Sequence, residues 1–262
     1  MCISTVVHTK SEQLIAGFKQ KDLHELLMLC GVEVVDIKGS LTGVIQEKWM
    51  CPNATLLAVC EEKREQFLSV FKRMRIVDEW INQKFSYGTI LFLPSASLID
   101  TTDRLSALQK LLKSRITFDQ FVFFAVDAPL THAQKTYAVA QGCPDTVSVE
   151  GQVYEYLLGK QAVSAYARKR CIVRGTYGAF NRYTAPDVKM LLSTWYQLYI
   201  HSDTGSVLVL SEQPYCCYHQ ALISSVLPAG FQVRVIGIKA PEKTPIAVYL
   251  KVIAQTVSAL AE

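Results

Sequence analysis

The sequence predicts an α/β protein with a mostly parallel sheet and helices on both faces, and three observations support this class. Four short apolar runs, at residues 89–93, 121–126, 171–174 and 207–210, each stop at a small or polar cluster. Such runs are typical of strands covered on both faces. Helical patterns lie between them, which favours parallel strands joined by crossover helices. Hydrophobic residues make up 50% of the 262 residues, enough for a large packed core.

The alternation of strands and helices is clearest from residue 88 onward. A further strand pattern covers residues 231–236. Apolar residues with helical spacing occur over residues 105–112, 154–158, 188–199, 218–226 and 246–260. A sheet built from such units lies between two helical layers. The expected fold is therefore a three-layer, Rossmann-like arrangement.

The first third of the chain is expected to contribute strands as well as helices. Residues 11–30 and 61–75 have the spacing of amphipathic helices. Residues 32–37 and 54–60 read as short strands. No internal repeat or low-complexity linker divides the chain, so a single domain over residues 1–262 is expected, with a subdomain break near residues 80–88 as the alternative.

Composition and charge narrow the classes of function. The net charge of +4 is mild, and the aromatic residues are too scattered to form a stacking platform, so nucleic acid is not the expected partner. The eight cysteines form no C-x-x-C and no zinc-ligand spacing, which predicts reduced thiols and no metal site. We expect a cytoplasmic protein without a membrane span, because no basic leader precedes a long apolar core and no apolar run approaches about 18 residues.

No catalytic signature names a reaction. The dinucleotide fingerprint G-x-G-x-x-G, the P-loop, the metalloprotease motif H-E-x-x-H and the nucleophile elbow G-x-S-x-G are all missing from the sequence. The sequence therefore leaves open whether the protein is an enzyme, and any cofactor stays unknown. Chemistry of its own would be group transfer or hydrolysis rather than redox.

The strongest candidate site is the segment Ser211-Glu-Gln-Pro-Tyr215, between a predicted strand and a helix. Open α/β sheets bind ligands where strands end, so Ser211 and Glu212 are candidates for orienting a ligand. The alternative is that Ser211 or Glu212 merely caps the following helix. His219 could act as a base for Ser211 or Tyr215, although no acid partner can be named.

A second candidate site follows the strand at 171–174. Arg174 and Arg182 could bind a phosphate or carboxylate in a bidentate manner. Thr184 and Asp187 would position the start of the next helix, whose amino end adds partial positive charge. A solvated basic turn with a structural cap is the alternative.

Two more polar residues are expected at the same edge of the sheet. Ser95 comes after the strand at 89–93, and Asp127 comes after the strand at 121–126. Asp127 could serve as a base or accept a hydrogen bond from a ribose. It could equally form a turn with the Ala-Pro that follows.

The order of these motifs resembles the YdcF/SanA-like family of α/β proteins over roughly residues 85–240. The residues that carry the resemblance are the segment 91–96 with the helix from Arg104, the strand at 121–126, the helix start with Arg182, Thr184 and Asp187, and the strand 207–210 with its Ser-x-x-Pro. The resemblance implies a Rossmann-like fold and a nucleotide-like ligand such as S-adenosylmethionine, and some members are linked to cell-envelope processes. Pro94-Ser95 stands where the family has a glycine-rich loop, which stiffens the backbone and removes room for a phosphate.

The leading hypothesis is a soluble Rossmann-like protein that binds a small anionic or nucleotide-like molecule at the carboxyl edge of its sheet. Ser211 and Glu212 would orient the ligand, while Arg174 and Arg182 would neutralise its charge. The alternative is a non-catalytic interaction or regulatory protein, for example a bacterial effector, with a degenerate site. The terminal helix and the first third each offer a surface for a homodimer.

Overall fold

A computed structural model describes residues 14–15, 17–32, 41–78, 86–93, 98, 101–102, 104–106, 117–126, 128–160, 169–175 and 185–260. The chain divides into two compact units. The helical unit comprises Met1–Trp80, Gln213–Ser225 and Lys239–Glu262, and the sheet unit comprises Ile81–Glu212 and Val226–Ile238.

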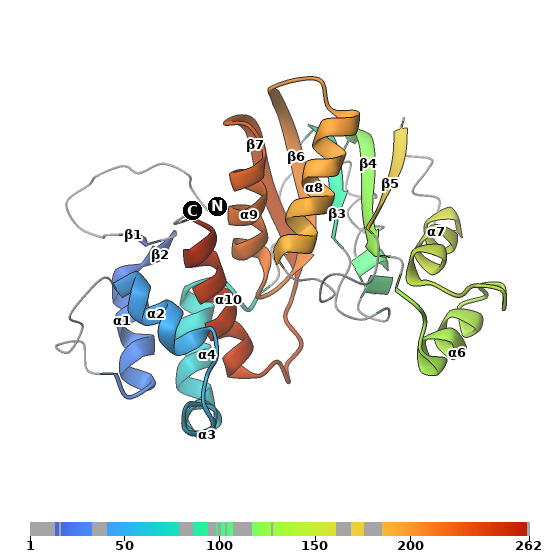
Figure 1. The fold of residues 1–262 in the computed structure, drawn as a ribbon. Coiled ribbons are helices and arrows are strands. Elements are labelled where there is room, and N and C mark those ends of the chain that lie inside the picture. Colours follow the sequence, from blue (N-terminus) through green and yellow to red (C-terminus); the bar gives the residue numbers. More distant parts are fainter. Residues whose placement is uncertain are drawn as a thin grey trace. The chain divides into compact units, whose positions relative to one another are not determined.

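The sheet unit is built on five parallel strands (Figure 1). They are β3 (Ser86–Phe92), β4 (Thr117–Val126), β5 (Lys169–Gly175), β6 (Thr204–Glu212) and β7 (Gly230–Ile238). Their order across the sheet is β5-β4-β3-β6-β7. Counted along the chain this is 3-2-1-4-5, the strand order of a Rossmann-like sheet. The predicted class is confirmed.

The strand order reverses between β3 and β6. From β3 the chain first adds β4 and β5 on one side, and then returns to add β6 and β7 on the other. Ile90 of β3 therefore pairs with Phe121 of β4 and with Leu208 of β6. In open α/β sheets such a reversal leaves a crevice outside the carboxyl ends of the two strands, where ligands bind.

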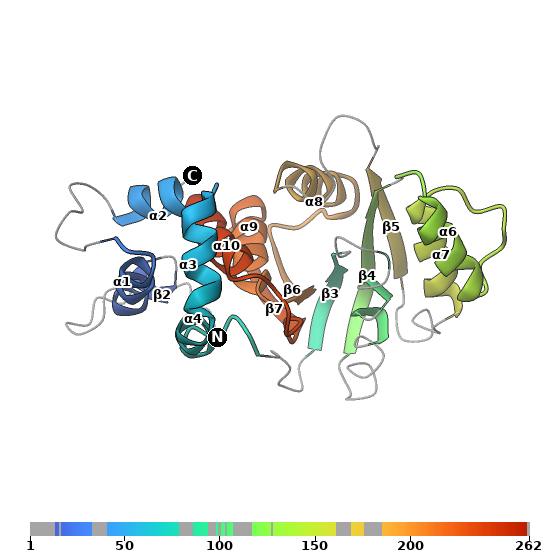
Figure 2. The same ribbon diagram turned by 90° about the horizontal axis from the view of Figure 1, so that it is seen from below.

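Helices cover both faces of the sheet unit. The helices described in this unit are α6 (His132–Ala140), α7 (Glu150–Lys160) and α8 (Ala185–Tyr199). Figure 2 shows α7 and α8 on opposite sides of β4 and β5. Residues 121–125 of β4 are all buried although their side chains alternate between the faces. Burial on both faces of the strand therefore explains why the apolar run in the sequence is continuous.

Aromatic rings form the centre of the core beneath α7. The rings of Phe92 on β3 and Phe123 on β4 stack with centroids 4.8 Å apart. Tyr154 of α7 lies 5.1 Å from the Phe123 ring and is fully buried. These contacts fix α7 on the sheet through ring packing.

The helical unit contains a short antiparallel pair, β1 (Leu14–Ile15) and β2 (Phe18–Lys19), with six helices described. The helices are α1 (Gln20–Leu29), α2 (Leu41–Trp49), α3 (Ala54–Glu62), α4 (Arg64–Arg73), α9 (Cys216–Val226) and α10 (Ile246–Ala259). Phe71 of α4 stacks on Tyr249 of α10 at 4.7 Å. Arg64 donates to the carbonyl oxygens of Glu242 and Thr244, which joins α4 to the loop before α10.

The strand predicted at residues 54–60 is wrong, because these residues form α3. The side-chain oxygen of Asn53 accepts a hydrogen bond from the backbone N–H of Leu56 at 2.8 Å and thereby caps the helix. A short apolar run cannot by itself distinguish a strand from a helix, and the capping residue was the deciding signal. Most of the strand predicted at residues 32–37 lies outside the described residues.

Two cysteines of the helical unit, the partly buried Cys30 and the buried Cys60, have thiols with raised pKa values. Burial, together with the neighbouring Cys60 thiol, raises the pKa of Cys30 from 9.0 to about 12. Burial, with the nearby Glu61 carboxylate, raises the pKa of Cys60 to about 11. A thiol with a raised pKa is a poor nucleophile. These residues are free cysteines with a packing role.

Replacing Phe123 with alanine should destabilise the protein by about 3–5 kcal/mol, because a fully buried ring is lost and a cavity remains. Leu198→Ala is the control, since Leu198 is 62% exposed and should change the free energy of unfolding by less than about 0.5 kcal/mol. Urea denaturation measures both values. Equal effects of the two substitutions would contradict this assignment of the core.

The raised thiol pKa values predict that the free energy of unfolding decreases at alkaline pH. The folded state keeps its thiol protons where the unfolded state loses them, so this contribution is complete below pH 9 and falls as pH rises towards about 12. A variant carrying Cys30→Ala and Cys60→Ala should lose less stability between pH 9 and pH 11. Urea denaturation at several pH values tests this, and parallel curves for the two proteins would count against it.

Candidate functional site

Two of the predicted site residues end β6 at the carboxyl edge of the sheet. The Ser211 side chain is buried, and its hydroxyl donates to the backbone carbonyl oxygen of Glu212 at 3.4 Å. The Glu212 side chain is 15% exposed. Both residues belong to the strand, whereas α9 begins at Cys216, so neither occupies the N-cap position that the alternative interpretation required.

Glu212 is paired with Arg104, a residue that sequence reasoning missed. Nη2 of Arg104 lies 2.6 Å from Oε1 of Glu212, and its Nε donates to Oε2 at 3.2 Å. Nη1 of Arg104 donates to the backbone carbonyl oxygen of Leu93, directly after β3. Arg104 therefore bridges the ends of β3 and β6, the two strands that flank the reversal in strand order.

The surroundings of Arg104 explain why this bridge is stable. Arg104 is only 3% exposed, and a guanidinium removed from water needs a carboxylate and further acceptors to compensate its desolvation. The two parallel contacts to Glu212 satisfy this requirement with the geometry that guanidinium and carboxylate share. The backbone N–H of Leu93 also donates to the carbonyl oxygen of Leu210 at 3.4 Å, which adds a second link between the strand ends.

A signal for Arg104 was present in the sequence. Leu98, Thr101 and Leu105 are buried, and helical backbone extends through the described residues of this segment. Position 104 is three residues after Thr101, so helical spacing places it on the same buried face. A lone arginine among buried positions after a strand indicates a charge that needs a partner.

The structure places Arg174 at the same edge as Glu212, but not beside it. Arg174 of β5 pairs with Ala125, near the carboxyl end of β4. The strand order puts β4 and β3 between β5 and β6. With neighbouring strands about 4.8 Å apart, the backbones at Arg174 and Glu212 are separated by about 14 Å across the sheet.

The other predicted residues are less fully described. Asp187 lies in the first turn of α8, and its side chain is outside the described part. Ser95, Asp127, Arg182 and Thr184 lie outside the described residues. In the helical unit, the His219 ring stacks on the Tyr215 ring at 5.9 Å, one helical turn away.

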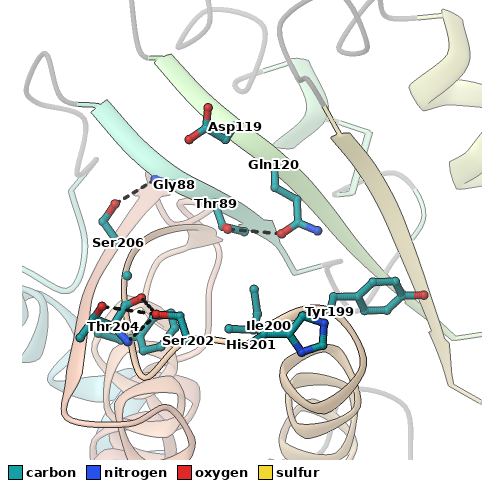
Figure 3. A pocket seen from close by; sticks show the side chains of 12 residues that line it. Gly88, Thr89, Asp119, Gln120, Tyr199, Ile200, His201, Ser202, Thr204 and Ser206 are labelled. Carbon is teal, nitrogen blue, oxygen red and sulfur yellow. Dashed lines mark hydrogen bonds between the residues drawn. The ribbon is translucent and has the colours of Figure 1, made fainter.

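A cleft of about 450 Å³ opens at the opposite, amino-terminal edge of the same sheet (Figure 3). We call it the amino-edge cleft. Its lining comes from the first residues of β3 and β4, the α8–β6 connection and the start of β7. These residues are Gly88, Thr89, Asp119, Gln120, Tyr199, Ile200, His201, Ser202, Thr204, Gly205, Ser206 and Phe231.

Polar side chains of two adjacent strands form one wall of the amino-edge cleft. Thr89 and Gln120 are partners in the register of β3 and β4, and the Thr89 hydroxyl donates to Oε1 of Gln120 at 3.5 Å. Asp119 and Gln120 point to opposite sides of β4 in Figure 3, as successive strand residues must. The Gln120 amide, rather than the Asp119 carboxylate, is therefore the polar group that β4 offers to the cleft.

Two glycines, Gly88 and Gly205, line the amino-edge cleft. The backbone N–H of Gly88 donates to the Ser206 hydroxyl at 2.8 Å, which ties β3 to β6. A Cβ on Gly205 would lie 2.7 Å from Cε1 of Phe231, so any side chain there would displace that ring. The Phe231 ring is also held edge-on against Tyr196 at 6.1 Å.

No known family model matches this chain, and no curated protein matches it either. The described residues contain no group of three or more His, Cys, Asp or Glu side chains that could hold a metal ion. Within the same described part, the helices are too short or too polar to cross a membrane.

A double-mutant cycle tests the Arg104–Glu212 bridge. Arg104→Met should destabilise the protein by about 3 kcal/mol, since it leaves the Glu212 carboxylate without its guanidinium. Glu212→Gln should also destabilise it, and the double variant should be more stable than the sum of the two changes by about 1–3 kcal/mol. Urea denaturation of the four proteins provides the values. Additive effects would show that the pair is not coupled.

Gly205→Ala should destabilise the protein by about 1–3 kcal/mol, because the added methyl group forces the Phe231 ring to move. Gly159→Ala in α7 is the matched control, since a Cβ there meets no atom within 4 Å. The control should gain about 0.5–1 kcal/mol from its lower backbone entropy in the unfolded chain. Thermal denaturation of both variants tests whether Gly205→Ala lowers the stability and Gly159→Ala raises it. A stabilised Gly205→Ala variant would rule out the close contact with Phe231.

Proposed function

We propose that the protein binds a small nucleotide-like ligand at the carboxyl edge of its sheet, with Glu212 as the central polar contact. The observation that carries this proposal is the buried Arg104, which holds the Glu212 carboxylate at the reversal between β3 and β6. A carboxylate fixed in this way is an acceptor for hydroxyl groups such as those of a ribose.

The spacing along the sheet supports an extended ligand over a simple anion. Glu212 and Arg174 lie at one edge, with two strands between β5 and β6. The strand spacing separates the backbones at the two positions by about 14 Å, a distance that an extended molecule spans more readily than a single phosphate ion. A molecule with hydroxyl groups at one end and negative charge at the other could contact both.

We assign the neutralisation of the ligand's negative charge to arginines other than Arg104. Because Arg104 is already paired with Glu212, it orients the carboxylate rather than neutralising a ligand. Arg174 and Arg182 are the residues we propose for that task. The resemblance to the YdcF/SanA-like family, with its nucleotide-like ligands, agrees with this assignment and stays a prediction. Any reaction would be group transfer or hydrolysis.

A second function is favoured by the same ion pair. Arg104 and Glu212 neutralise each other within the sheet unit. Such a pairing is consistent with a site that no longer binds a ligand. Together with Pro94 in place of a glycine-rich loop, this supports the alternative of a non-catalytic interaction or regulatory protein. The two functions differ in whether a small molecule stabilises the fold.

A thermal-shift screen distinguishes the two functions. The probes are nucleotides, S-adenosylmethionine, sugar phosphates and inorganic phosphate. A ligand at about 100 times its dissociation constant stabilises the fold by about 2.7 kcal/mol, which corresponds to about 2–4 °C for a chain of this size. We expect a nucleotide-like probe to shift the melting temperature.

Variants locate the bound probe. Glu212→Gln and Arg174→Ala should each abolish or reduce the shift, whereas Arg234→Ala, at an exposed position on β7, should retain it. A screen without any shift would contradict ligand binding and favour the interaction protein. A shift that survives Glu212→Gln would place the ligand elsewhere.

A further inference from the structure

We propose that the amino-edge cleft is a second binding site, for a small uncharged planar ring that carries a hydrogen-bond donor beside an acceptor, as a free nucleobase does. This site is separate from the proposed ligand site, because the two lie at opposite ends of the same strands. Thr89 at the cleft and Leu93 at the carboxyl edge are four residues apart, about 13 Å along an extended chain.

The Gln120 amide is the group that selects the ligand. Its Oε1 lies 3.5 Å from the Thr89 hydroxyl, a long contact between side chains on the same face of the sheet. Among the described residues, none lies within hydrogen-bonding distance of its Nε2, and Figure 3 shows the amide facing the space towards the α8–β6 connection. A primary amide presents a donor beside an acceptor, the complement of the donor–acceptor edge of a nucleobase.

The rest of the lining suits a planar, partly apolar body. Phe231 and Ile200 supply apolar surface, while His201 and Ser202 add polar groups at the α8–β6 connection. Pockets that bind small molecules combine apolar walls with a few placed polar groups, in volumes of roughly 300–1,000 Å³. The cleft, at about 450 Å³, falls within this range.

Charge decides between a free ring and a phosphorylated one. The lining residues that the structure describes include no Lys or Arg. A phosphate group would therefore gain no ion pair with a guanidinium or an ammonium group from these side chains. The cleft therefore favours an uncharged heterocycle over a nucleotide.

Titration of the full chain with adenine, uracil and glucose tests the proposal. Chemical-shift changes in ¹⁵N-labelled protein report where each probe binds. We expect adenine or uracil to shift the amides of residues 88–89, 119–120 and 200–206, and glucose to leave them unchanged. Gln120→Met keeps the side-chain length but removes the amide, and it should weaken binding about tenfold, the value of one hydrogen bond of ordinary strength.

Gln232→Met is the matched control, because Gln232 is an exposed glutamine on β7 and does not line the cleft. It should bind the base with unchanged affinity, as should Glu212→Gln at the other edge. The proposal is overturned if neither base shifts the cleft amides, if glucose binds there instead, or if Gln120→Met binds as tightly as the wild type. Loss of binding in Glu212→Gln alone would assign the base to the carboxyl edge.

Discussion

The buried charge of Arg104 is the constraint on which the carboxyl edge of the sheet unit depends. A guanidinium that is 3% exposed must be compensated by acceptors, and the acceptors here are the Glu212 carboxylate and the Leu93 carbonyl oxygen. These two groups belong to the strands that flank the reversal of strand order. Backbone pairing joins Thr89–Phe92 of β3 to Val207–Leu210 of β6, and the side-chain bridge extends this connection to the place where ligands bind in Rossmann-like sheets.

The two edges of the sheet unit offer different chemistry. At the carboxyl edge, an ion pair holds a carboxylate in place, which suits hydroxyl groups and, with Arg174 further along the edge, a charged extended ligand. At the amino edge, the Gln120 amide and the Phe231 ring line an open cleft whose described residues include no Lys or Arg. Under the two proposals, the opposite ends of the same strands would select two different kinds of ligand.

The sequence predicted the sheet well because its signals are local. A continuous apolar run such as Phe121–Ala125 arises from burial on both faces, so the class of fold and the strands of the sheet unit could be predicted. The helix α3 was mistaken for a strand, since its apolar run lacks clear periodicity and only the Asn53 cap reveals it. Ser211 and Glu212 were expected at the carboxyl edge of the sheet and lie there, whereas Arg104 and the amino-edge cleft were missed. Helical spacing indicates the buried face on which Arg104 lies, but its pairing with Glu212 and the lining of the cleft depend on contacts between residues far apart in the chain.

The role of Arg104 can be tested most directly by amide hydrogen exchange of the wild type and the Arg104→Met variant. If Arg104 joins the ends of β3 and β6, its replacement should accelerate exchange at Leu93 and at Ser211–Glu212 more than at the amino ends of the same strands, such as Gly88, where only the global loss of stability acts. Unchanged exchange at the carboxyl ends, or an acceleration there no larger than at the amino ends, would contradict the account.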